Sequence, residues 1–197
     1  MTGTDKETRL ISRKCRAAVF AALFVFVGAT LITIFAGTAF RPPKWAQWKD
    51  KEERVTVNGA EVQISLKDRS VNVFSTLPDY DDLLWKSNKE WLVSDLLIGD
   101  IDRDGDQEVL LLLWKRGSFG LHRPFWLEKD TRRFTQHIFI YDISLANGLK
   151  PVWMSSSLEI PVLDWQLDEK NLIHIFDTEN NVSVWGWMSW GLSRVDE

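Results

Sequence analysis

Carboxylates recur at alternate positions from Asp100 to Glu108, with a glycine at position 105 and an apolar run after them. A hard cation such as Ca²⁺ takes about six to eight oxygen ligands, which a tight loop with inward side chains can supply. We therefore predict that Ca²⁺ binds the side chains of Asp100, Asp102, Asp104 and Glu108 and the backbone carbonyl of Asp106. The alternative is a solvated acidic turn that needs no ion, because Asp and Gly both favour turns.

The residues after this loop distinguish it from the calcium site of a helix–loop–helix motif. Counted from Asp100, position 12 is Leu111, which cannot act as a bidentate ligand. The run Val109–Trp114 is typical of a buried strand. The segment from Leu97 to Gly105 resembles the FG-GAP/VCBS repeat, the blade unit of integrin-type β-propellers. That resemblance implies four-stranded antiparallel blades and a calcium loop between two strands of one blade.

A second feature is the run of 24 uncharged residues from Ala17 to Phe40. About 20 apolar residues cross the hydrocarbon core of a bilayer, so we expect residues 17–40 to be a transmembrane signal-anchor. The preceding residues 1–16 carry five Lys/Arg and two Asp/Glu, which favours a cytoplasmic N-terminus. The expected organisation continues with a spacer at 41–53 and an extracytoplasmic domain at 54–197. A cleaved signal peptide is the alternative, although its apolar region would be unusually long.

Composition limits the class of partner. The chain has 197 residues and a net charge of −4, and the charge after residue 16 is −7, from 19 Lys/Arg and 26 Asp/Glu. An acidic outer domain argues against binding nucleic acid. Cys15 is the only cysteine, so no disulfide can form within the outer domain.

Short apolar segments separated by turn residues fill the chain after residue 53 and predict an all-β domain. Strands are expected at these segments: 54–64 as a hairpin, 71–74, 83–85, 96–101, 109–114, 137–141, 152–155, 162–165, 172–176, 182–187 and 191–195. A weak repeat relates Trp85 and Asp100 to Trp153 and Asp164. We predict about two to three propeller-like antiparallel blades that do not close into a single-chain propeller, because closed propellers need four or more.

The connection from Lys115 to Trp126 combines glycine, proline, aromatic and basic residues, and Arg123, Phe125 and Trp126 are candidate contact residues. Long connections of this kind often carry recognition. The alternative is that the aromatic side chains fold back over the sheet. Together with Trp85-Lys86-Ser87 and Trp153-Met154-Ser155, this connection is also similar to bacterial envelope domains found with poly-γ-glutamate capsule-synthesis proteins. That resemblance implies an accessory role in the export of a surface polymer.

No sequence motif for a nucleophile or a phosphate loop is present, and His122, His137 and His174 are scattered. We therefore expect a non-enzymatic module in the cell membrane that is stabilised by Ca²⁺ and binds an envelope protein or polymer. The ion should hold its turn so that the Lys115–Trp126 connection is presented rigidly. The alternative function is an envelope hydrolase that uses a pair of carboxyl groups.

Overall fold

The structure is a computed structural model that describes residues 41–76, 83–120 and 122–195. The predicted tail and membrane span, at 1–16 and 17–40, lie outside the described residues. The chain forms two compact units, and the second, Pro42–Glu197, holds nearly all the described residues. Among the described residues, none forms a helix with the length and apolar character needed to cross a membrane.

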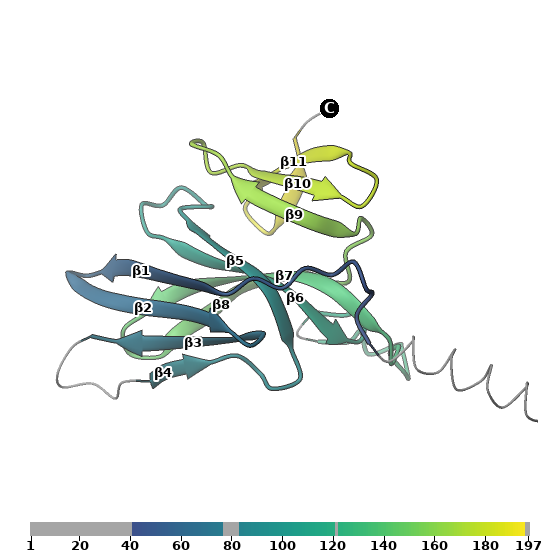
Figure 1. Cartoon of the computed structure of the whole chain (residues 1–197), viewed down its shortest axis with the longest axis horizontal. Coiled ribbons are helices and arrows are strands. Elements are labelled where there is room, and N and C mark those ends of the chain that lie inside the picture. The colour runs from purple at the N-terminus through teal and green to yellow at the C-terminus, as the bar shows by residue number, and fades with distance from the viewer. Residues whose placement is uncertain (1–40, 77–82, 121, 196–197) are drawn as a thin grey trace, which may run out of the picture. The chain divides into compact units, whose positions relative to one another are not determined.

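The described part of the second unit is all-β, as predicted, with three four-stranded antiparallel sheets and no closed barrel (Figure 1). Sheet A comprises β1 (Lys51–Val57), β2 (Ala60–Lys67), β3 (Ser70–Ser75) and β4 (Leu83–Lys86). Sheet B comprises β5 (Leu92–Gly99), β6 (Glu108–Arg116), β7 (Phe134–Ser144) and β8 (Gly148–Met154). Sheet C comprises β9 (Val162–Leu167), β10 (Ile173–Asp177), β11 (Val182–Trp187) and β12 (Leu192–Arg194). Each sheet is a meander in which consecutive strands pair, which is a propeller-like arrangement.

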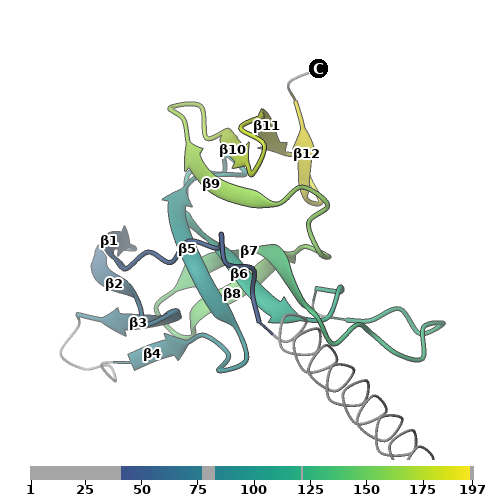
Figure 2. The ribbon, with the colours of Figure 1, turned by 45° about the vertical axis from the view of Figure 1, so that its right-hand side comes forward.

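Sheet B is the central layer, and β6 shows why its sequence is continuously apolar. Val109, Leu111 and Leu113 pack into a core shared with sheet A. Leu110 and Leu112 point to the other face and pack into a core shared with sheet C. Because successive side chains alternate between faces, a strand covered on both sides needs apolar residues at every position. Both views show β6 between the strands of the two outer sheets (Figures 1 and 2).

The residues before β1 pack on the domain. The Trp45 ring lies edge-on to the Trp114 ring, with 5.4 Å between centroids. The guanidinium of Arg69 lies 4.2 Å from the centre of the Trp48 ring. The first strand begins at Lys51, earlier than the expected hairpin at 54. The part of the predicted spacer from Trp45 onward is therefore fixed to sheets A and B.

The strand positions agree closely with the sequence prediction, but the register of the internal repeat differs. The acidic loop lies between the first two strands of sheet B, whereas Asp164 lies inside β9 and is opposite Phe176. The turn between β9 and β10 is instead closed by Asp168, whose Oδ1 accepts hydrogen bonds from the backbone N–H groups of Lys170 and Leu172. The counterpart of the acidic loop in sheet C is thus a short turn held by backbone donors.

Candidate metal centre

The acidic loop joins the end of β5 to the start of β6 and is shaped by hydrogen bonds to its own backbone. Oδ2 of Asp100 accepts from Gly105 N at 3.2 Å, and Oδ1 of Asp102 accepts from Asp104 N at 3.3 Å. Gly105 has φ of 100°, in the region that favours glycine. The chain therefore wraps around the carboxylates of its own first turn.

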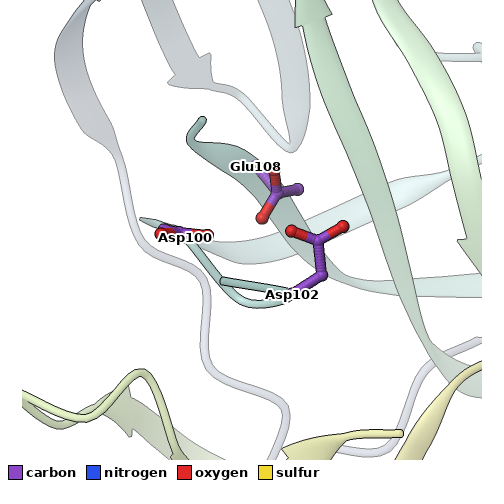
Figure 3. A group of neighbouring side chains, drawn as sticks. All are labelled: Asp100, Asp102 and Glu108. Carbon is purple, nitrogen blue, oxygen red and sulfur yellow. The ribbon is translucent and has the colours of Figure 1, made fainter. Parts of the chain in front are cut away.

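Three of the predicted ligands come together. Asp100, Asp102 and Glu108 each offer a carboxylate oxygen, and these oxygens lie within 4.8 Å of one another. Figure 3 shows the carboxylates of Asp102 and Glu108 facing each other, with Asp100 beside them. Asp104 and Asp106 are both exposed, and Oδ1 of Asp104 accepts a hydrogen bond from Asp106 N at 2.9 Å, so their predicted roles as ligands stay predictions. The group that the structure brings together is therefore a three-carboxylate centre of Asp100, Asp102 and Glu108.

When no cation is near, burial makes the negative charge of Glu108 unfavourable. Its residue is 2% exposed, and its Oε2 accepts a hydrogen bond from Ile101 N at 2.8 Å. Burial, with repulsion from the carboxylates of Asp102, Asp104 and Asp100, raises the pKa of Glu108 to about 7. Burial likewise raises the pKa of Asp102, with repulsion from neighbouring carboxylates adding to it. The loop thus concentrates negative charge at a site where water cannot fully solvate it.

The donor set fits a hard cation. Oδ1 of Asp100 is buried and has no hydrogen-bond partner among the described residues, although the other oxygen of the same carboxylate is satisfied. Buried polar atoms are normally paired, and an orphan atom calls for an explanation. A cation bound by Asp100, Asp102 and Glu108 would satisfy this oxygen and offset the repulsion between the three carboxylates. All ligands would be oxygens, which is the chemistry of Ca²⁺ or Mg²⁺ sites.

A polar groove of about 610 Å³ runs beside the loop, between the β1–β2 and β7–β8 turns. Its lining includes Glu108, Asp142 and Lys150, whose Nζ lies 3.6 Å from the Asp142 carboxylate, but not Asp100 or Asp102. The three-carboxylate centre therefore meets the groove through Glu108 alone.

The connection from Gly117 to Arg133, here called the aromatic loop, leaves the opposite end of β6. The strand has nine residues, so about 30 Å separates this loop from the acidic loop. The acidic loop therefore cannot brace the aromatic loop by contact, and any effect of an ion would have to pass along β6. Phe125 is 95% exposed and Trp126 69% exposed, so these side chains do not fold back over the sheet.

Sequence reasoning missed an ionic cluster on sheet B. Asp95 is buried, and its carboxylate lies 2.7 Å from Lys49 Nζ and 2.7 Å from Lys51 Nζ. The indole N–H of Trp165 also donates to Asp95 Oδ2 at 3.0 Å. The available signal was a single charged residue, Asp95, within a largely apolar strand, a position that requires partners. Through the two lysines and the indole donor, this cluster links the start of the domain and sheet C to sheet B, so we assign it a structural role.

No protein-family model matches the chain, and no curated protein matches it at a significant level.

Proposed function

We propose that the protein is a membrane-anchored, extracytoplasmic binding or assembly module that is stabilised by Ca²⁺, with propeller-like blades of the FG-GAP/VCBS kind. Residues 17–40 would form the single membrane span, with the N-terminus in the cytoplasm. The observation that carries the metal proposal is the buried Oδ1 of Asp100, which has no hydrogen-bond partner among the described residues and lies beside the carboxylates of Asp102 and Glu108. Extracellular calcium modules bind Ca²⁺ with dissociation constants of about 10⁻⁴–10⁻³ M, close to the concentration outside cells.

The binding role is supported by surfaces rather than by a catalytic arrangement. The aromatic loop exposes Phe125 and Trp126, with Arg123 beside them. Its partner would be a component of the cell envelope, such as a protein or a polymer. The ion would act on the stability of sheet B, because Glu108 is the first residue of the central strand β6.

The experiment is thermal unfolding of the full chain in lipid nanodiscs, followed by tryptophan fluorescence with and without Ca²⁺. All 11 Trp residues follow residue 40, so the signal comes from the outer domain. Ca²⁺ should raise the Tm of the natural chain but not that of Asp102→Asn. Asp68→Asn is the matched control, because Asp68 is exposed in the β2–β3 turn. An absence of any Ca²⁺-dependent shift, or an equal shift in Asp102→Asn, would refute the metal proposal.

The groove beside Glu108 supports one second candidate, an envelope hydrolase. A carboxyl group whose pKa is raised to about 7 has the property required of a general acid. Hydrolysis of envelope polymers that is lost in Glu108→Gln without loss of the fold would favour this candidate over the binding module. If no hydrolysis of envelope polymers is found, the groove has no catalytic role and is only a surface next to the metal-binding loop.

A further inference from the structure

The tip of the aromatic loop exposes large apolar side chains. Phe125, Trp126 and Leu127 are consecutive and all exposed. The Phe125 and Trp126 rings lie edge-to-face, with 4.9 Å between centroids. The tip is closed by hydrogen bonds from Leu127 N to the Pro124 carbonyl and from the Arg123 guanidinium to the Glu128 carbonyl. The aromatic pair is thus presented on a formed turn.

Positive charge surrounds this tip. The stretch from Lys115 to Arg133 contains six Lys/Arg and two Asp/Glu, a net charge of +4. The rest of the chain after residue 16 then has 13 Lys/Arg and 24 Asp/Glu, a net charge of −11. Arg123, Lys129, Arg132 and Arg133 are all exposed. The loop is therefore a cationic feature on a strongly acidic domain.

The base of the loop is firmly fixed to sheet B. The carboxylate of Asp130 accepts hydrogen bonds from Ser118 N at 2.9 Å and from Thr131 N at 2.6 Å. Ser157 N donates to the Ser118 carbonyl at 2.7 Å, which ties the loop to the segment after β8. Its exposed tip is therefore held away from the sheet by a rigid base.

The chain also enters the domain at this end. Trp45 contacts Trp114, two residues before the end of β6, and the aromatic loop follows directly after that end. Pro42 and Trp45 are three positions apart, so the second unit begins within about 11 Å of Trp45. Figures 1 and 2 both show the start of the described chain and the aromatic loop at the same end of β6. A membrane span that ends at Phe40 would hold this end of the domain close to the bilayer.

We propose that the aromatic loop binds the surface of the membrane itself, with Phe125 and Trp126 in the interface and the surrounding Arg and Lys on anionic lipid headgroups. The inference rests on the membrane anchor of the proposed function and names the partner of its aromatic loop. Indole rings favour the headgroup level, and basic side chains are attracted to anionic lipid. Two consecutive exposed aromatic side chains need an apolar environment, which a soluble anionic polymer does not offer.

The test uses the full chain in nanodiscs. Replacing Cys15, the only cysteine, by Ser allows a polarity-sensitive fluorophore to be placed by Leu127→Cys. Met188→Cys is the matched control, since Met188 is 54% exposed in sheet C, at the β11–β12 turn. Discs of phosphatidylcholine alone are compared with discs that also contain phosphatidylglycerol, and headgroup nitroxides report proximity to lipid.

We expect a blue shift and nitroxide quenching of the label at 127, but not at 188, and stronger effects with phosphatidylglycerol. The double variant Phe125→Ser with Trp126→Ser should lose both signals, and Lys129→Gln with Arg132→Gln, which leaves the Arg123–Glu128 hydrogen bond in place, should lose the dependence on anionic lipid. Equal aqueous exposure of both labels would overturn the proposal, as would equal quenching at 127 in both lipids. Shielding of the label only after addition of poly-glutamate or an envelope protein would also overturn it, in favour of that partner.

The Ca²⁺-dependent shift in Tm is measured in the same samples. If that shift is present while the label at 127 stays in water, the lipid inference fails and the metal proposal stands. If the label is quenched while no shift occurs, the metal proposal fails and the lipid inference stands.

Discussion

Glu108 occupies two roles at once, because it is both a candidate ligand and the first residue of a buried strand. Its side chain must be held within the fold by Ile101 N, yet it faces two other carboxylates. An isolated buried carboxylate costs free energy unless a positive group compensates it. The acidic loop therefore lowers the stability of the domain when no cation is bound, and a bound cation restores it.

Replacing Glu108 by Gln should separate these effects. Gln keeps an oxygen that can accept from Ile101 N but removes the charge, so the metal-free domain should gain about 1–3 kcal/mol of stability at a pH above the pKa of Glu108. The same change should abolish the response to Ca²⁺. Urea unfolding with and without chelator measures both, and Glu128→Gln, on the exposed aromatic loop, serves as the control. If Glu108→Gln instead destabilised the metal-free domain, the Glu108 carboxylate would have to make a favourable interaction other than the hydrogen bond from Ile101 N.

The spacing of the acidic residues predicted the grouping of Asp100, Asp102 and Glu108. It could not show that the side chain of Asp104 binds Asp106 N, because that choice is made by the local turn. The tie at Asp95 also could not be derived from spacing, since its partners Lys49 and Trp165 are distant in sequence.

At the scale of elements, β6 decides the architecture because both of its faces are covered. Leu110 and Leu111 are neighbours in the chain, yet they belong to different cores. Each is fully buried, so neither face of the strand is a solvent face. The same alternation occurs on β7, where Phe139 packs on the sheet A side and Ile140 on the sheet C side.

Leu110→Ala and Leu111→Ala should therefore be similarly costly, at about 2–5 kcal/mol each, because each leaves a cavity in a packed core. Leu83→Ala in β4 should cost less than about 1 kcal/mol, since Leu83 is 46% exposed. Chemical denaturation of the three variants gives the comparison. If only one of the two buried leucines proved costly, one of the outer sheets would not be packed as described.

The strands themselves were predictable because short apolar segments and turn residues are local signals. The unbroken apolar run in β6 indicated that the strand is buried, but it did not show that sheet A covers one face and sheet C the other. Face-to-face packing of the sheets depends on close approaches such as Gly148 against Trp85. Nothing local marks that glycine as a contact between sheets A and B.

At the scale of the whole molecule, Asp95 connects three parts of the domain. Lys49 and Lys51 belong to the segment before β1 and to β1, Asp95 belongs to sheet B, and Trp165 belongs to sheet C. The side chains of Lys49 and Lys51 are 33% and 27% exposed, so water weakens each ion pair.

Asp95→Asn should lower the free energy of unfolding by about 1–3 kcal/mol, because two cations lose a buried counter-charge while the shape of the side chain is kept. The segment before β1 should also become easier to cleave with trypsin at Lys44. Asp50→Asn, one residue before β1 and exposed, should change neither property. Unchanged cleavage in Asp95→Asn would show that the other contacts of the segment, such as Trp45 with Trp114 and Lys49 with Asp164, are sufficient to hold it.

The order of the strands has a kinetic consequence. Every strand pair in the described residues joins strands that are consecutive in the chain, and even the long Gly117–Arg133 connection has only 17 residues, so each sheet can form early. Sheet B nevertheless has a face, with Leu110 and Ile138, that only sheet C covers. If the chain emerges N-terminus first during export, this face stays exposed until β9 and β10, which supply the buried residues opposite it, have left the translocation channel. That interval is when the nascent domain is most exposed to aggregation or to capture by a chaperone.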